Sequence, residues 1–392
     1  MDHMDLHAII DPWARPVTSL VTILLIRRLQ FTIAQLLIIF TPRTSLLRAA
    51  SIPVQIALAV VAFPHVQHVI VPPISIHYRC LAGGTIALQT ILSISVSAMI
   101  RLDDTDVSKL TKTQHSTTTP GLRTKMAALT ALMNNQRCLG THLQNNWIAP
   151  FDESNPNRVP SRLEAVARTA LEFTTGYLFR QVAITELWDR LPLGLFWLLY
   201  IASWLNGIYL FGDLVGLLCG DRVEDHPPSF GSIRHTKTIR GFWGKYWHQA
   251  NRFAFQGASN YVCKEVLGLT GLVQRYLNIL FVFSLSGVFH VVTDAAEGIP
   301  PRESRAMSFF CAQAVGILLE DGAQALWRRW AGYRRGDAFA VPVWATLLGY
   351  LWTWGFLSVT AAWFAQPHEP IFLAKHGVPY GVIRRIGGAT GL

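Results

Sequence analysis

The sequence predicts an all-α membrane protein whose chain crosses the bilayer about eight times. Only 15% of its 392 residues are charged and 51% are hydrophobic, whereas soluble domains carry about 25% charged residues. Several apolar runs reach the roughly 20 residues that a helix needs to span a bilayer. None of these runs alternates with the two-residue period of a membrane β-barrel, so we expect every span to be a helix.

Eight segments are candidate spans. Val17–Phe40 is the weakest, because Arg27 and Arg28 interrupt it; a split helix lying partly at the interface is one alternative for it. It lacks a signal-peptide cleavage site, so we expect insertion through internal spans. Val166–Ala183 also carries charged residues but is otherwise rich in Leu, Phe and Tyr. The six clear runs are Ile52–Val71, Cys80–Ile100, Leu191–Leu218, Leu277–Val292, Met307–Trp327 and Val341–Ala365.

Basic residues in the loops indicate one topology. Arg101–Arg162 carries eight Lys or Arg, Asp221–Arg252 carries six and Arg328–Arg335 carries four. Cytoplasmic loops are enriched in such residues, and placing all three on the cytosolic side requires Val166–Ala183 to cross the membrane. We therefore expect residues 101–165 to form a cytosolic loop, partly mobile near Ser108–Pro120. This distribution also explains the net charge of +10 without any nucleic-acid partner.

The five cysteines, at positions 80, 138, 219, 263 and 311, are scattered and form no C-x-x-C pair. Most lie in or beside apolar runs, where a free cysteine behaves as a small hydrophobe. We predict neither a disulfide nor a metal site.

His290 lies deep in the apolar run Tyr276–Val292. A helix beginning near Leu277 carries this side chain roughly 20 Å along its axis, around or beyond the middle of the bilayer. An ionisable residue at that depth is a candidate functional residue. The alternative is a structural histidine bonded to a neighbouring helix.

A second feature lies upstream, in residues 240–252. Four aromatic residues, His248 and flanking basic residues make a segment suited to the membrane–water boundary. One interpretation is an interfacial helix with aromatic anchors. The other is a segment, within residues 220–255, that holds a polyanionic cosubstrate through Lys and Arg.

These two features together resemble a known family. Phe242-Trp-Gly-Lys-Tyr-Trp-His248 is similar to the Phe-Tyr/Trp-x-x-x-Trp-Asn/His element of the membrane-bound O-acyltransferases, in their wax synthase-like branch. Ser286-Gly-Val-Phe-His290 resembles the second element of that family, which ends in its key histidine. The resemblance covers about Asn135 to Trp330 and is closest to fungal terpenoid and meroterpenoid O-acetyltransferases. Further matches are Asn135–Gly140 with Trp147, Pro227–Gly231 and Gly316–Asp321.

The resemblance implies a single membrane-embedded acyltransferase domain over residues 1–392, in the endoplasmic reticulum. It implies transfer of an acyl group, most simply acetyl, from acyl-CoA to a hydroxyl of a lipophilic acceptor, with no tightly bound cofactor. Alternatives are a wax-ester or sterol-type enzyme using a longer acyl-CoA, or a membrane transporter, although we find no inverted repeat. The sequence identifies neither the acceptor nor the oligomeric state.

The resemblance also assigns roles to residues. His290 would be the general base, a role worth roughly 10²- to 10⁴-fold in rate, and apolar surroundings favour its uncharged form. His248 replaces the Asn of many members and would position the thioester or take part in the chemistry. The donor-binding residues would be Arg240, Trp243, Lys245, Trp247 and Arg252.

Other polar residues near the spans have simpler expected roles. Asp294 follows His290 by four residues and can share its helix face, but we favour an exposed carboxylate in the following loop. We expect Glu320 and Asp321 near the cytosolic end of their span, not beside His290. Asp213 is expected to pair within the bundle, and His65 and His68 to lie at the interface.

Overall fold

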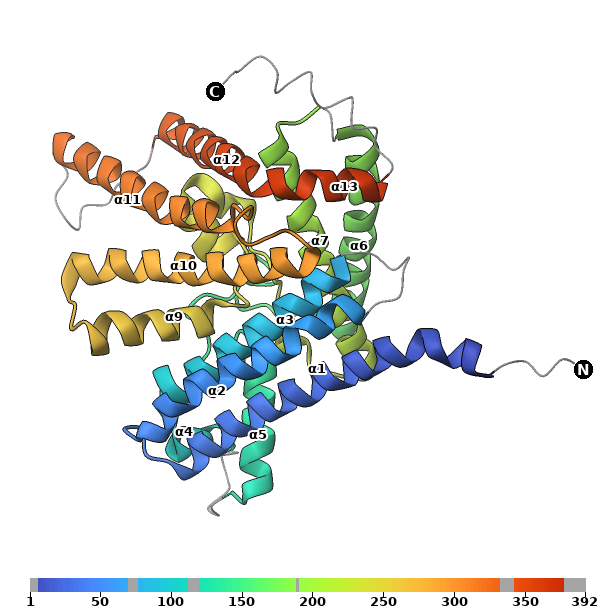
Figure 1. Cartoon of the computed structure of the whole chain (residues 1–392). Helices are drawn as coiled ribbons and strands as arrows, with labels where there is room; N and C mark the ends of the chain where they lie inside the picture. The colour runs from blue at the N-terminus through green and yellow to red at the C-terminus, as the bar shows by residue number, and fades with distance from the viewer. Residues whose placement is uncertain (1–5, 70–76, 112–119, 188–189, 332–341, 377–392) are drawn as a thin grey trace, which may run out of the picture. The chain divides into compact units, whose positions relative to one another are not determined.

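The computed structural model describes residues 6–69, 77–111, 120–187, 190–331 and 342–376. Within these residues every regular element is a helix, which confirms the predicted all-α class (Figure 1). The contacts divide the chain into two compact units, one of residues 1–144 and 251–307 and the other of residues 145–250 and 308–392. The single domain over residues 1–392 stays a prediction.

The first unit is built around long helices from the N-terminal third and around α10. It contains α1 (Leu6–Phe40), α2 (Leu46–Ala62), η1 (Phe63–His68), α3 (His77–Ile94), η2 (Ser95–Met99), α4 (Asp104–Thr111), α5 (Leu122–Asn134), α9 (Arg252–Asn260), η7 (Tyr261–Val266) and α10 (Gly271–Glu297). The alternative of a split first helix is wrong, because α1 is continuous. No Gly or Pro lies between Val17 and Phe40 to end it, and Arg27 donates to Gln89 from within the helix.

Buried amides hold α1, α2 and α3 together. The Gln30 side chain donates to the carbonyl of Gln55 and to the hydroxyl of Thr90, both at 2.9 Å. Gln55 returns a bond to the Gln30 carbonyl at 3.1 Å. Interhelical hydrogen bonds of this kind contribute about 0.6–2 kcal/mol each between membrane helices.

Arg48 is buried where the C-terminal end of α1 meets the segment that follows α3. Its guanidinium is 2% exposed and donates to the carbonyls of Leu37 and Thr41 at the end of α1. It also donates to the carbonyls of Ser97 and Leu102 beyond α3. The last carbonyls of a helix lack partners within that helix and carry partial negative charge, so a buried cation satisfies them.

The second unit is built on four long helices, α6, α7, α11 and α12, within the described residues. It contains α6 (Arg162–Val182), η3 (Ala183–Leu187), α7 (Leu193–Cys219), η4 (Val223–Asp225), η5 (Ile233–Lys237), α8 (Ile239–Gly241), η6 (Phe242–Tyr246), α11 (Ala306–Trp330, from Ser308 on), α12 (Val343–Ala365), η8 (Gln366–His368) and α13 (Glu369–His376).

Close approach of α7 and α12 depends on a glycine. A Cβ at Gly194 would lie 1.7 Å from the carbonyl oxygen of Ser358, so only Gly fits there. Beside this contact, Phe196 stacks on Tyr200 and meets Phe372 edge-on. The resulting aromatic core fixes the N-terminal end of α7. The segment carrying His248 follows the other end of this helix.

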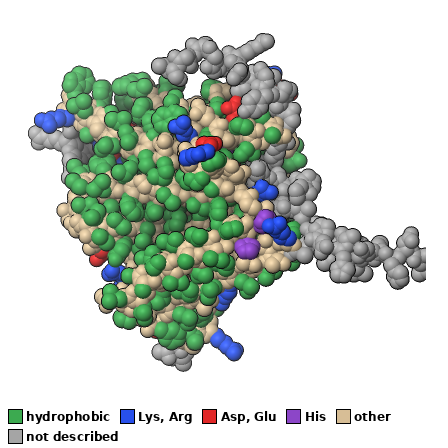
Figure 2. Space-filling model, viewed as in Figure 1, with side chains coloured by type: hydrophobic (Ala, Val, Ile, Leu, Met, Phe, Trp, Pro, Cys, Tyr) green, Lys and Arg blue, Asp and Glu red, His purple; other side chains and the backbone are tan. Residues whose placement is uncertain are grey.

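Six helices within the described residues are long and apolar enough to cross a membrane: 15–40, 46–68, 79–99, 193–219, 271–297 and 343–374. They expose large hydrophobic side chains, among them Leu25, Leu47 and Leu351, and Figure 2 shows hydrophobic side chains spread widely over the visible surface. The protein is therefore an integral membrane protein. The other two predicted spans fall on α6 and α11, which are helical but more charged, so the total of eight stays a prediction.

The predicted cytosolic loop, residues 101–165, contains two helices. Lys125 of α5 forms an ion pair with Asp104 of α4, with 2.6 Å between Nζ and Oδ1, and Leu129, Leu132 and Met133 of α5 are buried. Loop length and polarity did not reveal this packing. Residues 112–119 of the stretch expected to be mobile lie outside the described residues, as do the ends of the predicted spans at Val71 and Val341.

Candidate active site

His290 lies on α10, seven residues before the helix ends at Glu297. Its ring is half-buried and meets the Phe289 ring edge-on at a centroid distance of 4.9 Å. Nδ1 is 2.7 Å from the carbonyl oxygen of Ser286. Because a carbonyl oxygen only accepts hydrogen bonds, Nδ1 carries the proton here. The neutral ring therefore has its basic lone pair on Nε2.

The helix continues past His290, which corrects the expectation for Asp294. This carboxylate is 1% exposed and lies within α10, not in an exposed loop. It accepts a hydrogen bond from the Ser304 hydroxyl at 2.6 Å. Asp294 thus ties the loop after α10 back to the helix that carries His290.

The predicted donor-binding segment is a series of short turns and not one amphipathic helix. It passes through η5, α8 and η6, and the amide of Trp247 bonds to the carbonyl of Phe242 in a wide turn at 2.7 Å. Gly231 packs directly on this turn, since a Cβ there would lie 2.1 Å from the Lys245 carbonyl oxygen. Its amide donates to the Tyr246 carbonyl at 2.9 Å, so the Pro227–Gly231 motif supports the segment.

An aromatic cluster fills the interior of the segment. Phe242 is fully buried and stacks on Trp247 at 5.5 Å. Trp243 donates its indole N–H to the buried Gln313 of α11 at 3.2 Å. The side-chain amide of Gln249 donates to the carbonyls of Trp243 and Trp247. Trp243 and Trp247 are therefore held rigidly.

The predicted donor-binding cations differ in their surroundings. Arg240 makes two hydrogen bonds to the Asp321 carboxylate, so its charge is already compensated. Lys245 is exposed and lies over the Trp147 ring, with Nζ 4.5 Å from the ring centroid. Such a cation–π contact leaves an ammonium able to meet an anion. Arg252 lies in α9, where Nε donates to Gln256 and burial lowers the pKa of the guanidinium.

His248 follows this segment and is half-buried among aromatic rings. The Tyr209 hydroxyl lies 3.4 Å from its Nδ1. The Phe230 ring meets it edge-on at 5.9 Å, and the Trp247 ring lies 5.7 Å away. Tyr209 comes from α7 and Phe230 from the Pro227–Gly231 motif, so two distant segments fix this imidazole.

Asp213 pairs with a histidine. Nδ1 of His226 is 2.8 Å from Asp213 and its Nε2 is 3.2 Å from Asp221. Two carboxylates are best satisfied by a ring that donates from both nitrogens, and the hydrogen bond to Asp213 raises the pKa of His226. This clamp holds the start of the loop after α7.

The second unit thus brings together Arg240, Trp243, Lys245, Trp247 and His248, while His290 and Arg252 belong to the first unit. Sequence reasoning missed Tyr209 and Gln249 and gave no role to Phe230 or Trp147. The signal for Tyr209 is a hydroxyl within an apolar span, which needs a polar partner.

Residues 226–312, which include His248 and His290, match the model of the Membrane bound O-acyl transferase family. Acetyltransferase pyr8 of Aspergillus fumigatus is 38% identical over 226 residues, covering 55% of this chain and 51% of the relative. Acetyltransferase ataH of Aspergillus terreus is 44% identical over 164 residues, covering 40% and 52%. Acetyltransferase cdmC of Talaromyces verruculosus is 26% identical over 418 residues, covering 96% and 94%.

The chain spans about half the length of the first curated relatives that it matches. No solved structure matches it. The matches confirm the resemblance that the motifs around His248 and His290 predicted.

Proposed function

Because this chain is similar to the membrane-bound O-acyltransferases, we propose that it transfers an acetyl group from acetyl-CoA to a hydroxyl of a lipophilic acceptor, of terpenoid or meroterpenoid type. The observation that carries the proposal is the contact of 2.7 Å between Nδ1 of His290 and the Ser286 carbonyl oxygen, from which we infer the tautomer. A neutral imidazole with its lone pair on Nε2 is a suitable general base for an alcohol.

In the proposed reaction, Nε2 of His290 takes the proton of the acceptor hydroxyl as the oxygen attacks the thioester carbonyl carbon. A new C–O bond forms, the C–S bond breaks, and the CoA thiolate leaves. The imidazolium then returns its proton to this thiolate. A thiolate is a good leaving group, so the mechanism needs no covalent intermediate on the enzyme.

His248 is assigned the opposite tautomer. When the Tyr209 hydroxyl donates to Nδ1, the proton of the neutral ring resides on Nε2. An Nε2–H group can donate to the thioester oxygen as negative charge develops on it, a contact worth about 10²–10³-fold in rate. The Asn of many family members can donate an equivalent hydrogen bond through its amide.

The donor's phosphates are assigned to the basic face of the segment around Lys245. Lys245 is exposed and borders the rigid Trp147 ring, whereas Arg240 and Arg252 are half-buried. Arg240 contributes through its ion pair with Asp321, which fixes the turn that leads into Phe242. We place this face in the cytosol, where acetyl-CoA is available, and the protein in the endoplasmic reticulum membrane.

The proposal is tested by incubating microsomes that carry the chain with radiolabelled acetyl-CoA and a hydrophobic extract of the producing cells. We expect label in an apolar ester, absent from microsomes without the chain. Label from palmitoyl-CoA but not from acetyl-CoA would establish the longer-chain alternative instead. No transfer from either donor, with the chain shown to be inserted, would contradict the acyltransferase assignment.

A further inference from the structure

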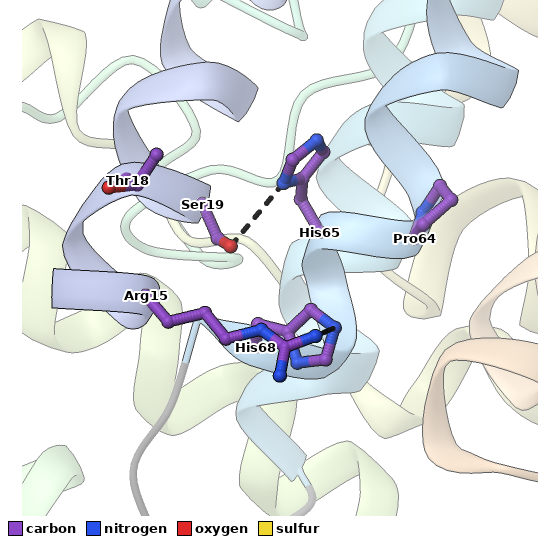
Figure 3. Close-up of a pocket in the computed structure, with 6 residues that line it drawn as sticks. All are labelled: Arg15, Thr18, Ser19, Pro64, His65 and His68. Atoms are coloured by element: carbon purple, nitrogen blue, oxygen red, sulfur yellow. Dashed lines mark hydrogen bonds between the residues drawn. The ribbon is translucent and has the colours of Figure 1, made fainter. Parts of the chain in front are cut away.

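A pocket of about 550 Å³ opens between α1 and the turn that follows α2 (Figure 3). Its lining residues are Arg15, Thr18, Ser19, Pro64, His65 and His68. Arg15 is the first residue of one candidate span and His68 is the last residue of the next. The pocket therefore lies at the matching ends of two adjacent candidate spans, and α1 itself begins earlier, at Leu6.

Among the residues that the structure describes, the lining carries basic groups and no carboxylate. In Figure 3 the Arg15 side chain extends to His68, with 3.1 Å between the guanidinium and Nε2. A guanidinium only donates, so Nε2 of His68 accepts and Nδ1 carries the proton. A guanidinium has five N–H donors and this contact uses one. His65 is held on the opposite wall by Ser19, at 3.3 Å.

Apolar side chains are also exposed on α1 and α2, on the side of the pocket toward the middle of each candidate span. Leu20, Val21 and Leu24 of α1 are 44–50% exposed. Val60 and Val61 of α2 are 65% and 58% exposed. A ligand that complements both parts has an anionic head for Arg15 and a hydrocarbon tail for these side chains.

We propose that this pocket binds the phosphate group of an anionic phospholipid, whose acyl chains lie along α1 and α2. Arg is suited to phosphate because its planar fork can donate two parallel hydrogen bonds. The interfacial position places the site at headgroup depth. This site is separate from the acetyl-transfer chemistry and does not depend on it.

The test is a binding measurement on the purified full-length chain in neutral nanodiscs, with phosphatidic acid as the probe and phosphatidylcholine as the reference lipid. We expect Arg15→Gln to weaken phosphatidic acid binding by about tenfold or more. The matched control is Arg123→Gln, which removes an exposed Arg from α5 of the same unit and should leave binding unchanged. Arg15→Lys should show an intermediate loss, because a Lys keeps the charge but not the fork.

Each of the other outcomes overturns the proposal. Equal losses in Arg15→Gln and Arg123→Gln would indicate a general surface charge effect. Unchanged affinity in both Arg15 variants would place the lipid elsewhere. If inorganic phosphate displaced the lipid at equal concentration, the acyl chains would contribute nothing and the pocket would be a site for free phosphate. Correct folding of each variant is checked by its elution profile and thermal stability.

Discussion

Hydrogen bonds define two different histidines in this protein. His290 donates from Nδ1 to the Ser286 carbonyl on its own helix, which keeps the lone pair on Nε2. His248 has its Nδ1 next to the Tyr209 hydroxyl, from a different helix. We propose that the first ring accepts a proton and that the second, with the Tyr209 hydroxyl donating to its Nδ1, donates a hydrogen bond from Nε2. This division depends on tautomers, which residue identity alone does not set.

Substitutions at His248 distinguish hydrogen-bond donation from proton transfer by this side chain. His248→Asn should keep substantial activity, because an amide can donate the same hydrogen bond, whereas His248→Ala should lose roughly 10²–10³-fold in kcat. Tyr209→Phe should lower kcat without raising the KM for the acceptor, since it removes only the group that sets the tautomer. Steady-state kinetics in microsomes measure both. Equal inactivity of His248→Asn and His248→Ala would assign proton chemistry to His248.

The stability of the contact between His226 and its two carboxylates, Asp213 and Asp221, should depend on pH. Asp213 raises the pKa of His226 above its ordinary value of 6.5. The stabilisation is therefore fully present below the unfolded-state pKa and is lost as pH rises through the higher folded-state pKa. Amide exchange at residues 220–226 should therefore accelerate as pH rises through the raised pKa of His226, beyond the intrinsic base-catalysed increase. In His226→Gln this excess should vanish, and an unchanged excess there would exclude the clamp.

At the scale of elements, the segment carrying His248 acts as a folded support and not as a simple interfacial helix. Three features make it rigid: the wide turn at Phe242–Tyr246, the aromatic cluster around Phe242, and the close packing of Gly231. An interfacial anchor would need only apolar area. Such rigid construction is what the precise placement of a cosubstrate requires.

Gly231 and Gly244 both belong to this support, but within the described residues only Gly231 packs closely against another part of the chain. Gly231→Ala forces a Cβ against the Lys245 carbonyl and should displace the turn, raising the KM for acetyl-CoA more than that for the acceptor. Gly244→Ala is the matched control, since no atom lies within 4 Å of its Cβ position among the described residues. The measurement is the KM for acetyl-CoA and for the acceptor in both variants, at equal expression. A similar KM change in both would show that the Gly231 contact is not needed.

At the scale of the whole molecule, the sequence predicted the long helices well because each is a long apolar run whose composition requires burial in lipid. It also marked both histidines as candidate site residues through short local motifs, and their roles stay predictions. It could not predict pairs such as Arg240 with Asp321, 81 residues apart, or Tyr209 with His248, 39 residues apart. Those contacts depend on helix packing, which hydropathy does not specify. The burial of Asp294 escaped prediction for the same reason.

The predicted topology fixes the side of the membrane on which each loop lies. If eight segments cross the membrane, a cysteine introduced at Ser154 should lie in the cytosol and one at Glu303 in the lumen, both residues being exposed. A membrane-impermeant maleimide should then label Ser154→Cys in sealed microsomes, and Glu303→Cys only after permeabilisation. A background with the five native cysteines replaced serves as the control. Labelling of both from the same side would mean that an odd number of the predicted spans between them fails to cross.

Acetyl transfer by His290→Ala and His290→Asn measures whether His290 is the general base. Both should insert normally and lose roughly 10²-fold or more in kcat, since neither side chain can accept the acceptor's proton. Ser284→Ala, on the same helix, should retain activity and thus controls for disturbance of α10. Retention of wild-type turnover by His290→Ala would show that His290 is not the general base.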